Sequence, residues 1–160
     1  ARFERREVGP VEFCVLFEAE AAALELELDA RRILAGLHGE LRPAMVEALR
    51  CCGSTLRTAL LTNNVTPLAD QELAGSSVLE VVEMFDVVVE SSVVGCRKPE
   101  PAFYELACER LGVEPSACVF LDDLGVNLKP ARAMGMTTIK VVDPATAIAQ
   151  LEQVLGIQLG

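Results

Sequence analysis

The sequence predicts an open α/β fold in which short parallel strands alternate with helices. From residue 57 onward, short apolar runs rich in β-branched side chains recur between segments of helical character. Glycines follow three of these helical segments, at Gly112, Gly135 and Gly156, and helices commonly end at glycine. Strands that alternate with helices form a parallel sheet with right-handed crossovers, and nearly continuous apolar runs are typical of strands covered on both faces.

Residues 1–50 are predicted to be helical. Apolar side chains recur at steps of three and four residues between 11 and 37, which predicts a helix over that segment. A second helix is predicted over 44–51, because Pro43 favours a first helical turn and Gly53 follows the end of the segment.

Residues 51–160 contain the predicted strands, which alternate with three further helices. Each strand is short, apolar and rich in β-branched side chains, and a glycine follows each of the helical segments. The predicted strands are 58–61, 85–90, 118–121 and 137–142, and the predicted helices are 99–111, 126–134 and 144–155.

Polar side chains follow the strands. Thr62 and Asn63 follow the first, Lys98 lies in the loop after the second, and Asp122 and Asp123 follow the third. Ligands of such sheets bind at the carboxyl ends of the strands. Each position also has a purely structural explanation, since asparagine and aspartate cap helices and a lysine can precede a helix that begins at proline.

Taken together, these side chains have the chemistry of a small anion and metal site. Adjacent carboxylates repel unless a cation compensates, and hard oxygen ligands beside a phosphate suit Mg²⁺. Hydroxyl and amide groups bind phosphoryl oxygens, and a lysine neutralises charge. A receiver domain uses similar groups, but its acidic pair lies on the first strand and its lysine comes last. Here Lys98 precedes Asp122 and Asp123, which disfavours a receiver domain.

The composition excludes several classes of partner. Lys and Arg number 14 against 24 Asp and Glu, so the net charge of −10 argues against binding to nucleic acid or to anionic lipid. The longest charge-free run, residues 58–69, is shorter than the roughly twenty residues of a membrane-spanning helix. Six cysteines occur without a CxxC pair, mostly in apolar segments, which favours free thiols and a reducing cytoplasm.

The ordered motifs resemble those of the haloacid dehalogenase (HAD) superfamily. They are Leu-Leu-Thr-Asn at 60–63, Gly-Cys-Arg-Lys-Pro-Glu-Pro at 95–101, and the Asp-Asp segment at 119–132, with a closing Leu-Gly-Ile-Gln-Leu at 155–159. Within the superfamily, the chain is similar to the N-terminal phosphatase domain of soluble epoxide hydrolase and to the HAD domain of acyl-CoA dehydrogenase family members. The resemblance implies a Rossmann-like open parallel sheet with a helical cap.

The resemblance also implies roles for single residues. Thr62 and Asn63 would hold the transferring phosphoryl group of a small phosphorylated substrate, and Lys98 would stabilise charge on the nucleophile and the phosphate. Asp123 would be the direct Mg²⁺ ligand, and Asp122 would orient Lys98 or the waters of the metal.

Asn127 would support the metal site from the following helix. The aspartate pair favours a phosphatase over the dehalogenases that name the superfamily, because those enzymes work without metal.

The family's first motif has no counterpart in the 160 residues. It is an Asp-x-Asp sequence whose first aspartate attacks phosphorus to form an aspartyl-phosphate and whose second acts as general acid and base. By resemblance, residues 1–50 are a partial helical cap, and residues 51–160 are a HAD-like core that lacks its first strand. In the family that strand lies between those ending at Thr62 and Asp122. We therefore expect a break of about 9–10 Å in the sheet there.

Three functions follow from these motifs. The first is a Mg²⁺-dependent phosphoric monoester hydrolase in its full-length form, of which this chain is a catalytically incomplete piece. The second is an inactive HAD module that acts in folding or partner binding, and the third, disfavoured, is a haloacid dehalogenase. An N-terminal segment outside the sequence is expected to fill the break, while a second chain, as in a homodimer, or a rearrangement of the sheet is left open.

Overall fold

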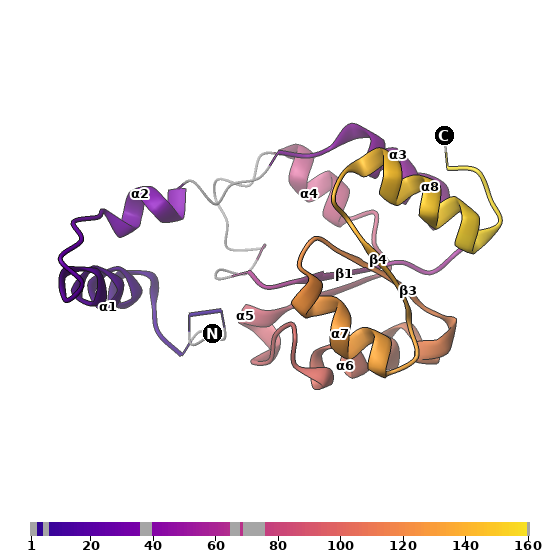
Figure 1. The fold of residues 1–160 in the computed structure, drawn as a ribbon. Coiled ribbons are helices and arrows are strands. Elements are labelled where there is room, and N and C mark those ends of the chain that lie inside the picture. Colours follow the sequence, from indigo (N-terminus) through magenta and orange to yellow (C-terminus); the bar gives the residue numbers. More distant parts are fainter. Residues whose placement is uncertain (1–2, 5–6, 36–39, 65–67, 69–75, 160) are drawn as a thin grey trace.

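The computed structural model describes residues 3–4, 7–35, 40–64, 68 and 76–159, and within them it contains four short strands (Figure 1). All four were predicted from the sequence, with small changes in their bounds. They are β1 (Ala59–Thr62), β2 (Val87–Glu90), β3 (Val119–Asp122) and β4 (Thr137–Lys140).

The strands form two separate parallel sheets. β1 pairs with β2, so that Thr62 lies opposite Glu90, and β3 pairs with β4, so that Asp122 lies opposite Lys140. Among the residues that the structure describes, no ladder joins β1 to β3. The expected break between the strands that end at Thr62 and Asp122 is therefore confirmed.

Helices cover both sides of the strands (Figure 1). On one side, α6 and α7 pack on the strands in a cluster that includes Val89, Phe103 and Ala131. On the other, α3 and α8 pack against each other and on β4 through a cluster that includes Ala48 and Ile139. All four helices were predicted, and their bounds are α3 Pro43–Gly53, α6 Pro101–Leu111, α7 Gly125–Ala133 and α8 Pro144–Leu155.

The prediction of one helix over 11–37 is wrong. The segment forms α1 (Pro10–Ala22) and α2 (Ala30–Ala35), which contact each other and lie away from the strands in Figure 1. Glu25 adopts a φ of 59°, a left-handed conformation that ends the first helix. The Asp29 carboxylate then accepts the Arg31 and Arg32 N–H groups at 3.0 and 3.2 Å, which starts the second. Residues 36 and 37 of the prediction lie outside the described residues.

Several short elements were not predicted. They are α4 (Ser76–Val82), α5 (Ser91–Val94) and the 3-10 helix η2 (Pro115–Ala117), each too short to show a hydrophobic period. The proposed division at residue 50 stays a prediction; α3, which spans it, packs against α8. Across the described ranges, no helix has both the length and the apolar character needed to cross a membrane.

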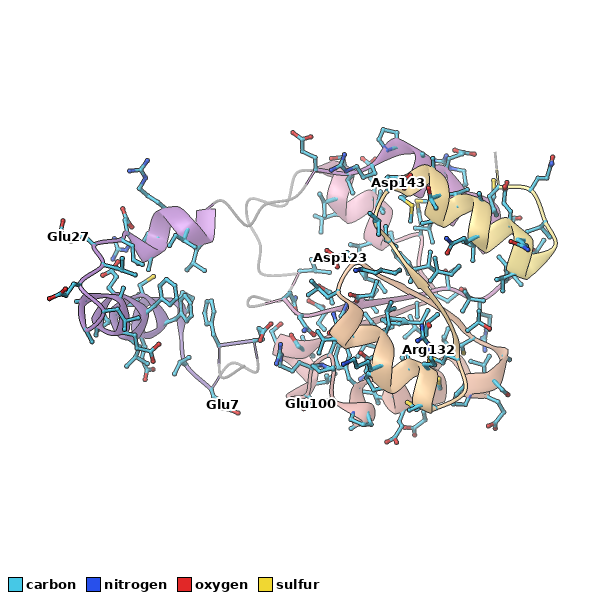
Figure 2. The ribbon with its side chains drawn as sticks, in the orientation of Figure 1. Glu7, Glu27, Glu100, Asp123, Arg132 and Asp143 are labelled. Carbon is cyan, nitrogen blue, oxygen red and sulfur yellow. The ribbon has the colours of Figure 1, made fainter. Side chains whose placement is uncertain are left out.

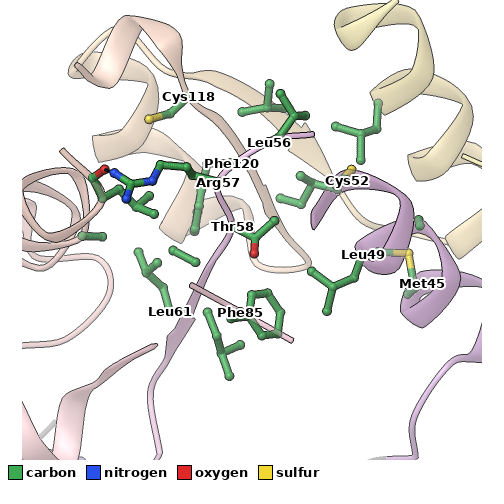
Figure 3. A pocket seen from close by; sticks show the side chains of 18 of the residues that line it. Met45, Leu49, Cys52, Leu56, Arg57, Thr58, Leu61, Phe85, Cys118 and Phe120 are labelled. Carbon is green, nitrogen blue, oxygen red and sulfur yellow. Dashed lines mark hydrogen bonds between the residues drawn. The ribbon is translucent and has the colours of Figure 1, made fainter. Parts of the chain in front are cut away.

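An apolar cavity of about 710 Å³ lies between β1 and β3, and we call it the slot (Figure 3). Residues 59–61 of β1 and 119–121 of β3 line it, together with side chains of α3 and α6. Successive side chains of a strand point to opposite faces of its sheet. Three consecutive residues of one strand can therefore border the same cavity only if the cavity lies along the edge of that strand. The slot therefore lies where the two sheets fail to join.

Candidate active site

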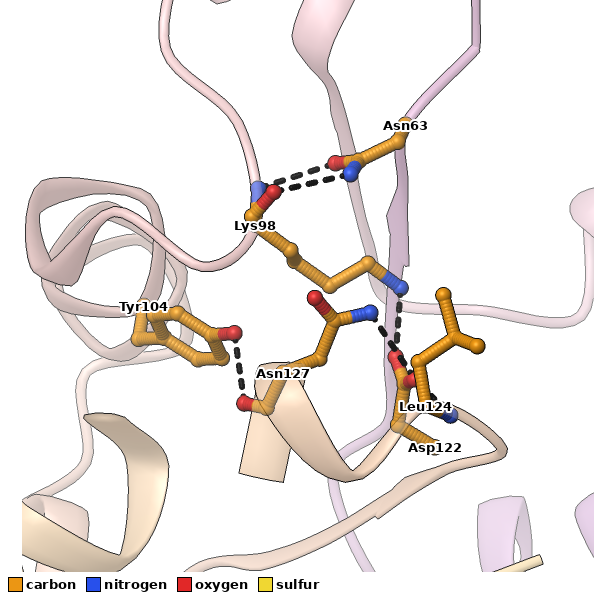
Figure 4. Close-up of polar contacts among 6 residues, drawn as sticks. All are labelled: Asn63, Lys98, Tyr104, Asp122, Leu124 and Asn127. Carbon is orange, nitrogen blue, oxygen red and sulfur yellow. Dashed lines mark hydrogen bonds and ion pairs between the residues drawn. The ribbon is translucent and has the colours of Figure 1, made fainter. Parts of the chain in front are cut away.

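The centre of the site is an ion pair between Lys98 and Asp122 (Figure 4). The Lys98 Nζ lies 2.8 Å from Asp122 Oδ2, and the two side chains are 13% and 3% exposed. Lys98 comes from the loop between α5 and α6, and Asp122 ends β3. The ammonium group also lies 5.9 Å from the centre of the Phe120 ring, within reach of a cation–π interaction. The structure thus brings together two of the residues predicted from the motifs.

Asp122 uses both of its carboxylate oxygens in contacts with this chain. Besides the Lys98 contact at Oδ2, Oδ1 accepts the Leu124 N–H at 2.8 Å and the Asn127 Nδ2 at 2.9 Å. Burial raises the pKa of Asp122, but the hydrogen bonds from Lys98, Leu124 and Asn127 outweigh it and hold the pKa below its usual range. Asp122 is therefore an ionised group that anchors its neighbours.

Asn63 joins the end of β1 to the Lys98 loop (Figure 4). Its Nδ2 donates to the Lys98 carbonyl and its Oδ1 accepts the Lys98 N–H, both at 2.9 Å. Thr62, the last residue of β1, is partly buried beside it. The carboxyl ends of β1 and β3 and the loop after β2 therefore converge, as the sequence predicted.

Asp123 and Asn127 have the donor atoms that Mg²⁺ prefers. Asp123 is exposed directly after β3 (Figure 2). The Asn127 Nδ2 donates to Asp122, so the atom of this side chain that can bind a metal ion is its Oδ1. Within the described parts of the chain, no three His, Cys, Asp or Glu side chains form a metal-binding group. Mg²⁺ commonly takes one or two protein carboxylates and completes its shell with waters and phosphate oxygens, so these residues fit a partial Mg²⁺ site. The predicted roles of all six site residues stay predictions.

Tyr104 is a contributor that the sequence did not indicate. Its buried hydroxyl donates to the Asn127 carbonyl at 2.7 Å, which fixes the first turn of α7, and its ring packs edge-on against Phe120. Burial, and then the charge of Asp122, raise the pKa of Tyr104, so its hydroxyl stays protonated and donates. A single tyrosine in an apolar helix is typical of core packing, and nothing in the sequence pairs it with Asn127.

Tyr104→Phe is expected to destabilise the protein by about 1–2 kcal/mol, because the buried hydrogen bond from the Tyr104 hydroxyl to the Asn127 carbonyl is lost. Urea unfolding measures the loss. Tyr104→Leu, which also removes the ring from Phe120, should cost more, about 3 kcal/mol. An unchanged unfolding midpoint for Tyr104→Phe would contradict this role.

Comparison with known proteins places these motifs in one family. A model described as haloacid dehalogenase-like hydrolase matches residues 5–135. Mouse acyl-CoA dehydrogenase family member 10 is 44% identical over 119 residues, which are 73% of this chain and 11% of that protein. Rat bifunctional epoxide hydrolase 2 is 41% identical over 118 residues, 73% of this chain and 21% of that protein. The chain therefore spans only a small part of the length of these relatives.

A phosphatase of Mycobacterium tuberculosis is 36% identical over 95 residues, 59% of this chain and 42% of that protein. A Porphyromonas gingivalis protein described as a predicted HAD-like family hydrolase superposes with a TM-score of 0.73 at 21% identity, over 98% of this chain and 78% of its own. A Bacteroides thetaiotaomicron HAD family enzyme, solved with magnesium and inorganic phosphate, gives a TM-score of 0.60 at 18% identity, over 87% of this chain and 72% of that enzyme's chain.

These findings confirm the resemblance and the α/β fold class, which the structural neighbours share. The family model covers most of the chain, including the loop of Lys98 and the segment of Asp122 and Asp123. The chain belongs to the haloacid dehalogenase-like hydrolase family.

Proposed function

We propose that this chain is the core of a Mg²⁺-dependent phosphoric monoester hydrolase that acts on small phosphorylated molecules. The observation that carries the proposal is the Lys98–Asp122 pair, held at the meeting point of two strand ends beside the exposed carboxylate of Asp123. A fixed cation next to a free carboxylate suits phosphoryl transfer, in which negative charge must be neutralised. A relative named as a phosphatase, and a neighbour solved with magnesium and phosphate, support the same chemistry.

Each residue has a defined task in this proposal. Thr62 donates to a phosphoryl oxygen, and the Lys98 ammonium, oriented by Asp122, neutralises charge on the phosphate and on its attacker. Asp123 and the Asn127 Oδ1 hold Mg²⁺. Bound Mg²⁺ supplies Lewis-acid stabilisation of the phosphoryl oxygens. Within residues 1–50, the helices α1 and α2 contribute part of the cap in this proposal.

The nucleophile, in this proposal, reaches the site on an extended segment that occupies the slot. The slot is apolar and is bordered by an edge of β1 and an edge of β3 that pair with no strand among the described residues, which suits a strand with apolar side chains on both faces. A strand parallel to both neighbours would end between Thr62 and Asp122, beside Lys98. An aspartate there can attack phosphorus while the bond from phosphorus to the alcohol oxygen breaks and a general acid protonates the leaving oxygen; water then hydrolyses the aspartyl-phosphate and releases inorganic phosphate.

The proposal is tested by comparing the protein expressed from its whole gene with the 160-residue chain. We expect the whole protein to hydrolyse 4-nitrophenyl phosphate with Mg²⁺ but not with a chelator, and the 160-residue chain to show no turnover. No turnover by either would favour an inactive module that serves folding or partner binding. Halide release from a 2-haloacid without metal would instead indicate a dehalogenase.

The compartment is also part of the proposal. No disulfide joins any of the described cysteines, and the sulfur atoms of Cys108 and Cys118 lie 4.0 Å apart. Burial raises the pKa of Cys108 to about 11, which keeps this thiol protonated and unreactive. Unpaired thiols at such short range fit a reducing cytoplasm.

A further inference from the structure

We propose that the side chain of Asn63 is a positioning group for Lys98 and not a ligand of the phosphoryl group. This inference rests on the proposed function, since it concerns how the phosphate-neutralising lysine is held. It also changes the role that the family resemblance implied for the Asn63 side chain.

The contact between Asn63 and Lys98 is reciprocal (Figure 4). The Asn63 amide gives one hydrogen bond to the Lys98 peptide and takes one from it, both at 2.9 Å, and the two residues are 35 positions apart. Two antiparallel hydrogen bonds between planar groups fix orientation as well as distance. The amide oxygen and one amide hydrogen of Asn63 are therefore committed to the backbone of the lysine loop.

Lys98 is consequently anchored at both ends. Asn63 holds its backbone, while Asp122 at 2.8 Å and the Phe120 ring at 5.9 Å hold its ammonium group. A lysine side chain loses rotamer entropy when it is fixed, so a defined ammonium position requires that the backbone of the lysine be held in place. Without the Asn63 amide, the Lys98 backbone loses this anchor, and only the ammonium group of Lys98 is still held.

The neighbouring Asn64 provides a matched comparison, because the same side chain there makes different contacts. Its Oδ1 accepts the Ser92 hydroxyl at 3.0 Å, its Nδ2 donates to Glu90, and its carbonyl accepts the buried Ser91 hydroxyl at 2.9 Å. Asn64 thus ties the end of β1 to the end of β2 and to α5, whereas Asn63 ties it to Lys98. Comparing substitutions at these two adjacent asparagines therefore separates a general effect on the segment after β1 from a specific effect on Lys98.

The first test measures amide hydrogen exchange of the Lys98 N–H in the full-length protein. Asn63→Ala is expected to speed this exchange about tenfold, since the acceptor is lost, and Asn63→Asp, which keeps the acceptor oxygen, should speed it less. Asn64→Ala should leave the Lys98 amide within about twofold of wild type. Equal exchange in wild type and Asn63→Ala would overturn the proposal, whatever the protein's activity.

The second test separates positioning from direct contact by a double-mutant cycle on the affinity for inorganic phosphate in the presence of Mg²⁺. If Asn63 acts through Lys98, Asn63→Ala weakens phosphate binding about tenfold with Lys98 present and less than about twofold in a Lys98→Met background. Equal losses in both backgrounds would show direct contact and overturn the proposal. If wild type binds no phosphate, the proposed function fails, and hydrogen exchange alone decides the role of Asn63.

Discussion

Replacing Asp123 by alanine is expected to lower the Mg²⁺-dependent kcat of the full-length protein at least about a thousandfold. Asp123 is the exposed member of the aspartate pair, and Asp122 already uses both of its oxygens on Lys98, Leu124 and Asn127. In the proposed function Asp123 is a charged ligand of Mg²⁺, and the stabilisation of phosphoryl transfer by such an ion amounts to several kcal/mol; about 4 kcal/mol corresponds to a thousandfold. Initial rates over a Mg²⁺ titration measure the loss.

An exposed carboxylate away from the site is the control for this substitution. Glu109 lies on the outer face of α6, and Glu109→Ala should leave kcat within about twofold of wild type. Because Asp123 is exposed, its replacement should also leave the thermal midpoint nearly unchanged. Full activity of Asp123→Ala at every Mg²⁺ concentration would refute the assignment of Asp123 as the metal ligand.

The place of the site could be predicted from the sequence because it depends on strand ends. A short apolar run that stops at a polar residue marks the edge of a parallel sheet, and this held for Thr62 and Asp122. The contacts of Asn63 with the Lys98 backbone and of the Lys98 ammonium with Asp122 then bring the ends of β1 and β3 to one site. The break between β1 and β3 was predicted as well, from the family resemblance and not from any local pattern, and no ladder joins these strands among the described residues.

The direction of each side chain could not be predicted, because it depends on partners far away in the chain. Asn63 takes its partner from a loop 35 residues later, and the Tyr104 hydroxyl takes its partner from the backbone of another helix. An asparagine after a strand and a tyrosine in an apolar helix look the same in sequence whatever they contact. Such pairings arise from tertiary packing and are absent from any local pattern.

The N-terminal helices show a second limit of pattern reading. The apolar spacing of 11–37 continues through the turn, so periodicity alone joins α1 to α2. The break comes from the left-handed Glu25 and from the Asp29 side chain, which competes for backbone N–H groups. Aspartate is a common N-cap, and its capping preference outweighed the periodic pattern here.

Lys98→Met is expected to destabilise the full-length protein by about 3 kcal/mol at neutral pH in metal-free buffer. The substitution keeps the length of the side chain but leaves the ionised Asp122, whose side chain is 3% exposed, without its cation. Removal of one partner of a buried ion pair is costly because the remaining charge stays desolvated. Lys140→Met is the control: Lys140 lies opposite Asp122 in the strand pairing but is exposed, and its loss should cost less than about 0.5 kcal/mol.

The destabilisation by Lys98→Met should depend on pH in one direction. In wild type the pKa of Asp122 is below its ordinary value, so the stability that Asp122 contributes is present above about pH 4 and is lost as the pH falls through the lowered pKa. Without Lys98 the largest of the contacts that lower this pKa is gone, while those from Leu124 and Asn127 remain, so the variant protonates Asp122 at higher pH and escapes the cost of the unpaired charge. Urea unfolding from pH 7 down to pH 3 should therefore show the difference between wild type and variant shrinking as the pH falls. A difference that stays constant over this range would mean that the lost stability comes from packing of the lysine chain and not from the charge on Asp122.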